Sequence, residues 1–224
     1  MKHVWTLEAE LCDLAHEDDI TAALHTLRLI GSAKEPYRIA VTQDWHAGGA
    51  ETYILTFTVW QAGLERQYVM KACTAWAPGQ RLGQISDSWL RRRTLLTELG
   101  VSTPALIGTG AALLVEEYIP YEFLDALDDA NERTRVLLLR ALGRTAGLLV
   151  RAGFAPLSTH DWRSRGADVV LIDFGQDLGP PGLALGSESG LLAELLNLID
   201  QRNIDLASDE VHAVGAEYES ALAG

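Results

Sequence analysis

The sequence contains few cysteines, no long apolar run and no apolar leader, and each shortage excludes a class of protein. Two cysteines, Cys12 and Cys73, are too few for the disulfide framework of a small secreted domain. No apolar stretch approaches the roughly 20 residues of a membrane-spanning helix, because Arg140 and Arg144 interrupt the most leucine-rich segment. Residues 1–13 lack the apolar core of a signal peptide. We therefore expect a soluble cytoplasmic protein with reduced thiols and no membrane contact.

Basic residues are also scarce. Lysine and arginine number 18 against 31 aspartates and glutamates, which gives a formal net charge of −13 over 224 residues. A chain this acidic repels a phosphate backbone, so we expect no nucleic-acid partner. Apolar residues make up 48% of the chain and charged residues 22%, within the range of globular proteins. The length suits one domain or two small lobes.

Hydrophobic periodicity divides the chain into a strand-rich first part and a helix-rich second part. Alternation with a period of two predicts an antiparallel meander of three strands over residues 37–73, with Gly48-Gly49 at its first bend. Three- and four-residue spacing is typical of helices. It predicts helices over 5–30, 86–99, 132–151, 191–199 and 210–222, and short apolar strands are predicted over 111–118 and 169–172. This order indicates an α+β fold.

Two charged residues stand in or beside strands that are otherwise apolar. Lys71 lies inside the predicted strand 67–73, and a core-side lysine needs an anionic partner, of which a nucleotide phosphate is one candidate. Asp173 directly follows the apolar residues 170–172, where a carboxylate can face a cleft and hold Mg²⁺. The alternatives are a lysine whose head reaches water and an aspartate that accepts backbone hydrogen bonds.

The order of the features along the chain is more informative than any one of them. A glycine turn is followed by the strand lysine, a helix, an apolar strand ending in Glu116-Glu117-Tyr118, a long helix and Asp173-Phe174-Gly175. This order resembles the protein-kinase-like fold. It is more narrowly similar to the family of aminoglycoside phosphotransferases and choline kinases, over roughly residues 37–222.

The resemblance implies a two-lobed fold with ATP in the cleft between the lobes. Residues 1–116 would form an N-lobe with an N-terminal helical segment and an antiparallel sheet, and residues 117–224 a short helical C-lobe. A carboxylate of the first-lobe helix should pair with the lysine. The implied contacts are Gly48, Gly49 and Lys71 to the phosphates, Asp87 to Lys71, Glu117 and Ile119 to the adenine, and Asp173 to Mg²⁺.

The catalytic loop departs from the family pattern, which is His-x-Asp with Asn five residues after the Asp. His160-Asp161-Trp162 resembles the family's His-Gly-Asp-Trp form with the middle residue missing, so Asp161 would orient the acceptor hydroxyl. Gly166 then stands in the Asn position. Only six residues separate Gly166 from Asp173. A two-stranded hairpin needs about eight, so we expect one strand of this loop to be deleted.

A rival register, counted back from Asp173, puts Pro156 and Ser158 at the His and Asp positions and leaves no catalytic carboxylate. Two functions therefore stay open. The first is an ATP- and Mg²⁺-dependent phosphotransferase acting on a small-molecule hydroxyl, with the acidic chain favouring a cationic acceptor. The second is a non-catalytic kinase-like protein that binds a nucleotide or a protein partner. A run of three arginines, residues 91–93, is predicted to be a solvated helix face, with anion binding as the alternative.

Overall fold

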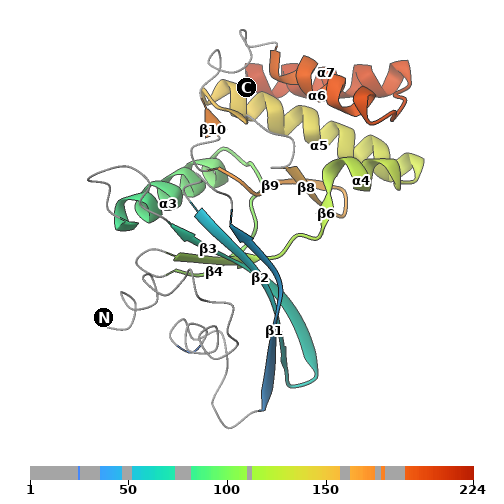
Figure 1. Cartoon of the computed structure of the whole chain (residues 1–224). Coiled ribbons are helices and arrows are strands. Elements are labelled where there is room, and N and C mark those ends of the chain that lie inside the picture. Colours follow the sequence, from blue (N-terminus) through green and yellow to red (C-terminus); the bar gives the residue numbers. More distant parts are fainter. Residues whose placement is uncertain are drawn as a thin grey trace. The chain divides into compact units, whose positions relative to one another are not determined.

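The protein is an α+β protein whose strands pair in antiparallel fashion (Figure 1). The computed structural model describes residues 25, 36–46, 52–73, 82–109, 113–156, 162–174, 178–179 and 190–224. The helix predicted over 5–30 lies outside these residues apart from His25, which is helical, and so does the predicted bend at Gly48-Gly49. No helix in the described part of the chain is long and apolar enough to cross a membrane.

The chain divides into two compact units. The first comprises residues 1–90 and 104–118, and the second comprises residues 91–103 and 119–224. Helix α3 (Leu82–Glu98) is divided between them after Leu90. The lobe boundary expected between residues 116 and 117 stays a prediction.

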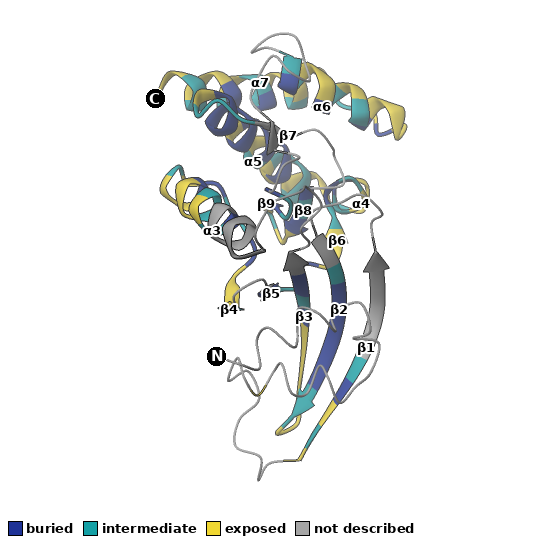
Figure 2. Cartoon of the chain, turned by 60° about the vertical axis from the view of Figure 1, so that its left-hand side comes forward, coloured by how far each residue is buried: buried dark blue, intermediate teal, exposed yellow. Residues whose placement is uncertain are grey.

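The first unit contains a five-stranded antiparallel sheet in the order β1-β2-β3-β5-β4. Its strands are β1 (Tyr37–His46), β2 (Thr52–Gln61), β3 (Leu64–Cys73), β4 (Leu106–Thr109) and β5 (Leu113–Glu117). Strands β2 and β3 join through a two-residue turn at Ala62-Gly63, where both residues have the positive φ that such a turn requires. The centre of β2, residues 55–59, is buried on both faces (Figure 2). The meander predicted over 37–73 is confirmed.

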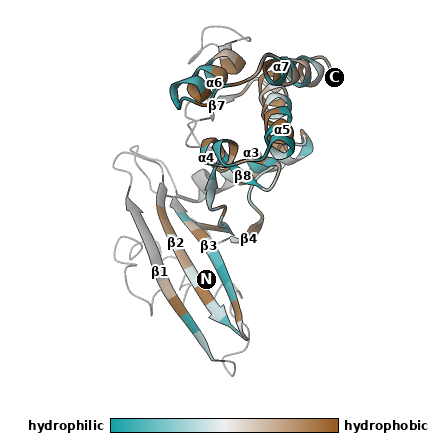
Figure 3. Cartoon of the chain, turned by 90° about the vertical axis from the view of Figure 1, so that its right-hand side faces the viewer, coloured by the Kyte–Doolittle hydropathy of each residue, from teal (hydrophilic) through white to brown (hydrophobic). Residues whose placement is uncertain are grey.

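Helices dominate the second unit. They are α4 (Phe123–Asp128), α5 (Glu132–Arg151), α6 (Gly190–Gln201) and α7 (Ser208–Ala223). Helix α5 begins where the side chain of Asn131 accepts a hydrogen bond of 3.0 Å from the backbone N–H of Thr134. Its apolar residues recur on one side, which Figure 3 shows as brown patches among teal, and Leu139 and Leu149 are fully buried. Helix α7 packs along α5 (Figure 1).

Short strands complete the second unit. A three-stranded sheet has the order β6-β8-β9, with β6 (Tyr121–Glu122), β8 (Trp162–Arg165) and β9 (Asp168–Leu171). Strand β7 (Ala155–Pro156) pairs with β10 (Leu178–Gly179). The predicted strand over 169–172 is confirmed as β9. The expected deletion of a strand before Asp173 is wrong, because β8 and β9 form a complete hairpin with its turn at Gly166-Ala167.

Candidate functional site

Lys71 is a buried cation in the middle of the five-stranded sheet. Strand β3 lies between β2 and β5, and Lys71 stands opposite Ile54 on one side and Leu114 on the other. Its ammonium nitrogen lies 3.1 Å from Oε2 of Glu116, and the two side chains are only 6% and 1% exposed. The ammonium also lies 5.2 Å from the centre of the Trp89 ring of α3, within the range of a cation–π contact.

The register of the sheet explains this ion pair. Glu116 is two residues beyond Leu114 on β5, so its side chain projects from the same face of the sheet as that of Leu114. Removing either charge from a buried pair leaves the other in a medium of low dielectric constant, so the two charges depend on each other. The sequence predicts a helix carboxylate, Asp87, in this role. Asp87 lies on α3, and its side chain is outside the described part of the structure.

Of the two residues expected to contact adenine, Glu117 is held by the backbone of a neighbouring segment. The side chain of Glu117 accepts a hydrogen bond of 3.0 Å from the backbone N–H of Ala105, and the Glu117 N–H donates to the Ala105 carbonyl at 2.9 Å. Glu117 therefore fastens β5 to the start of β4. Ile119 is buried, with 5% of its surface exposed.

Asp173 has buried residues on both sides of it in the sequence, all of them in the second unit. The preceding strand β9 contributes Val169, Val170 and Leu171, all fully buried, and the following residue, Phe174, is 1% exposed. The Leu171 N–H donates to the carbonyl of Ser102 at 2.9 Å. Asp173 itself is half-buried. Its backbone is thus fixed on both sides.

Part of the loop expected to carry catalysis, residues 162–165, is the strand β8. Residues 162–165 pair residue by residue with 168–171, and Gly166 has φ +65° in the turn between them. Gly166, which stands in the Asn position when Asp161 is the catalytic Asp, is therefore a turn residue that needs a left-handed conformation. Asp161 lies outside the described residues and directly precedes β8 in the sequence.

The described residues offer no complete metal cage. No group of three or more His, Cys, Asp or Glu side chains lies close enough together there to hold an ion. Mg²⁺ in nucleotide sites is held by one or two carboxylates together with substrate phosphates and water. Asp173 is the described carboxylate that the sequence predicts as a Mg²⁺ ligand.

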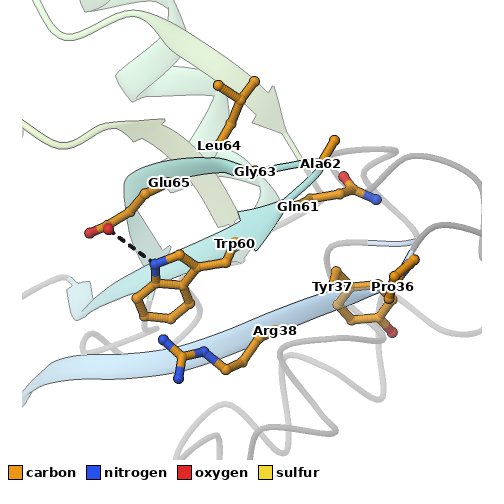
Figure 4. Close-up of a pocket in the computed structure, with 9 residues that line it drawn as sticks. All are labelled: Pro36, Tyr37, Arg38, Trp60, Gln61, Ala62, Gly63, Leu64 and Glu65. Carbon is orange, nitrogen blue, oxygen red and sulfur yellow. Dashed lines mark hydrogen bonds between the residues drawn. The ribbon is translucent and has the colours of Figure 1, made fainter.

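A shallow surface groove lies at the other end of the β2–β3 hairpin from Lys71. Figure 4 shows Trp60 at its centre, with Arg38 and Glu65 beside the indole ring. The Arg38 guanidinium lies 3.9 Å from the ring centre, and the indole N–H donates to Oε2 of Glu65 at 3.0 Å. These two contacts with the indole link β1 to the β2–β3 hairpin near its turn.

Comparisons with known proteins place the chain in no family. No family model matches the sequence, and no curated protein matches it.

Proposed function

We propose that this chain is a kinase-like protein that binds ATP together with Mg²⁺. The observation that carries the proposal is the buried lysine of β3 paired with a carboxylate, in an antiparallel sheet whose third strand is followed by helix α3. Protein kinases need a strand lysine held by an ion pair to contact nucleotide phosphates. Here the carboxylate comes from the neighbouring strand β5, and Trp89 contributes the contact from α3.

Each predicted site residue has a place in this function. Lys71 contacts the phosphates together with the backbone at Gly48 and Gly49. The backbone at Glu117–Ile119 borders the adenine. Asp173 supplies the oxygen ligand for Mg²⁺, which neutralises phosphate charge.

The hairpin before Asp173 favours the non-catalytic form of the proposal. In the family pattern the hairpin lies between the Asn and the Asp of Asp-Phe-Gly, so the Asn position must precede β8 and is Asp161 or an earlier residue. The orienting Asp of His-x-Asp then falls at Pro156 or earlier. No Asp or Glu occurs between Glu132 and Asp161. This register leaves no carboxylate to orient an acceptor hydroxyl.

Asp161 acquires a different role in this register. The Asn of the pattern helps to hold Mg²⁺, and a carboxylate oxygen is an equally suitable ligand for this hard cation. Asp161 would then bind metal together with Asp173. The alternative function, phosphotransfer to a small cationic acceptor, requires Asp161 to orient the acceptor hydroxyl instead.

Nucleotide binding is expected to raise the melting temperature of the wild-type chain. At a concentration of ATP and Mg²⁺ about 100 times the dissociation constant, binding stabilises the native state by about 2.7 kcal/mol. For a chain of this size that is an increase of about 5–10 °C. With Mg²⁺ present, ATP should raise the melting temperature of Asp173→Ala less than that of the wild type. In EDTA, where ATP binds without the metal, the increase in melting temperature should be smaller and the same for both proteins. A wild-type melting temperature that ATP and ADP do not change contradicts the proposal.

Asp161→Asn separates the two forms of the function. An amide keeps an oxygen ligand but cannot accept a proton from an acceptor hydroxyl. The non-catalytic form predicts that wild type and Asp161→Asn both bind Mg²⁺ and ATP, and that neither consumes ATP with a panel of amino alcohols and aminosugars. Turnover by the wild type that falls by about 100-fold or more in Asp161→Asn would instead support the phosphotransferase.

A further inference from the structure

Two of the three arginines on α3 contact the residue that follows Asp173. The guanidinium of Arg92 donates a hydrogen bond of 3.3 Å to the backbone carbonyl of Phe174. The guanidinium of Arg93 lies 5.8 Å from the centre of the Phe174 ring. Both arginines are half-buried, whereas Arg91 is exposed. The expectation of a solvated arginine face is therefore wrong for Arg92 and Arg93.

These contacts act on the backbone at Asp173. Strand β9 fixes the chain up to Leu171 through its pairing with β8, and three residues later the burial of Phe174 fixes it again. The Arg92 hydrogen bond adds a polar restraint at the Phe174 carbonyl, where a charged donor makes a stronger bond than a neutral one. The Arg93 contact adds a weaker restraint on the ring, since its distance is near the limit of a cation–π contact.

From this geometry we infer that Arg92 is a positioning residue for Asp173, with Arg93 as a weaker partner. The inference rests on the proposed function, because the carboxylate of Asp173 needs a fixed orientation only if it is a metal ligand. Groups that orient a metal ligand without touching the metal typically change metal affinity by about 10–100-fold. Arg92 would thus couple helix α3 to the Asp173–Phe174 segment through a backbone carbonyl.

The test compares Arg92→Met with Arg91→Met in the full-length chain. Both variants remove a guanidinium from the same helix, but only Arg92 contacts Phe174. Hydrogen exchange of the free protein should become at least about tenfold faster in a peptide covering residues 170–174 of Arg92→Met, because the segment opens locally more often. Arg91→Met should exchange like the wild type. Arg92→Lys, which keeps a charged donor, should restore much of the protection.

The second measurement is the affinity for ADP with Mg²⁺ and with EDTA. Arg92→Met should weaken ADP binding about tenfold in Mg²⁺ and leave it unchanged in EDTA, since the lysine and adenine contacts are intact. Unchanged exchange at 170–174 overturns the inference whatever the nucleotide result. Faster exchange with unchanged Mg²⁺-dependent affinity also overturns it. A wild type that binds no nucleotide refutes the proposed function and the positioning role together, while the exchange data still show whether Arg92 restrains the segment.

Discussion

Replacing Gly143 by alanine is expected to lower the free energy of unfolding by about 3 kcal/mol, a large loss for a single added methyl group. A Cβ atom at Gly143 would collide with the backbone carbonyl oxygen of Val214 on α7. A backbone carbonyl inside a helix cannot rotate away, so the two helices must separate. The loss corresponds to a melting temperature lower by about 6–12 °C.

Gly215→Ala is the matched control for this substitution. Gly215 lies on α7 itself, and a Cβ atom there would meet no atom within 4 Å. Alanine has the higher helix propensity, so this variant should be up to about 1 kcal/mol more stable than the wild type. Both free energies can be measured by urea denaturation. If Gly143→Ala is as stable as Gly215→Ala, the close packing of α5 against α7 described here is incorrect.

Glu116→Leu is expected to destabilise the protein by about 3–5 kcal/mol, because it leaves the buried ammonium of Lys71 without the carboxylate that balances it. Lys71→Met should be destabilising for the reciprocal reason. The double variant Lys71→Met/Glu116→Leu removes both charges and replaces them with apolar side chains of similar volume. Its stability should lie within about 1 kcal/mol of the wild type, because neither charge remains to be desolvated.

Denaturation of the four proteins forms a double-mutant cycle for this pair. The cycle predicts a coupling energy of at least about 5 kcal/mol, above the usual range for residues in contact, because each single substitution leaves one buried charge uncompensated and the double variant leaves none. Trp89→Leu is the control for the other contact of the Lys71 ammonium, since it removes the cation–π contact but leaves the ion pair with Glu116 in place. Additive effects of the two single substitutions would mean that Lys71 and Glu116 do not form a buried pair.

The regular elements were predictable where the hydrophobic pattern is strong. The helix over 132–151 carries many leucines at three- and four-residue spacing, and the structure has the same bounds. Strand β8 was missed because its inward residues are Trp162 and Ser164, so apolar alternation is absent. The hydroxyl of Ser164, which is 3% exposed, donates to the Gly166 carbonyl at 3.0 Å. A polar residue satisfied in this local way gives no hydrophobic signal.

Only part of the candidate site was predictable from the sequence: the buried lysine was, and its carboxylate partner was not. Lys71 is conspicuous because it interrupts an apolar strand, and the need of a buried cation for an anion follows from the sequence alone. The identity of that anion depends on which strands pair and in what register. The contact of Glu116 with Lys71 spans 45 positions of the sequence and follows from the pairing of β3 with β5. A glutamate inside the apolar residues 113–118 was the available signal.

The most direct test of the central claim, that Lys71 contacts nucleotide phosphates, is a calorimetric titration with ATP and Mg²⁺. It compares the wild type with the folded double variant Lys71→Met/Glu116→Leu, and uses adenosine as the ligand that lacks phosphates. We predict that the double variant binds ATP about 10–100-fold more weakly than the wild type, as expected for the loss of a charge-assisted hydrogen bond, and binds adenosine equally well. Equal ATP affinity of the two proteins, or no ATP binding by the wild type, would contradict the claim.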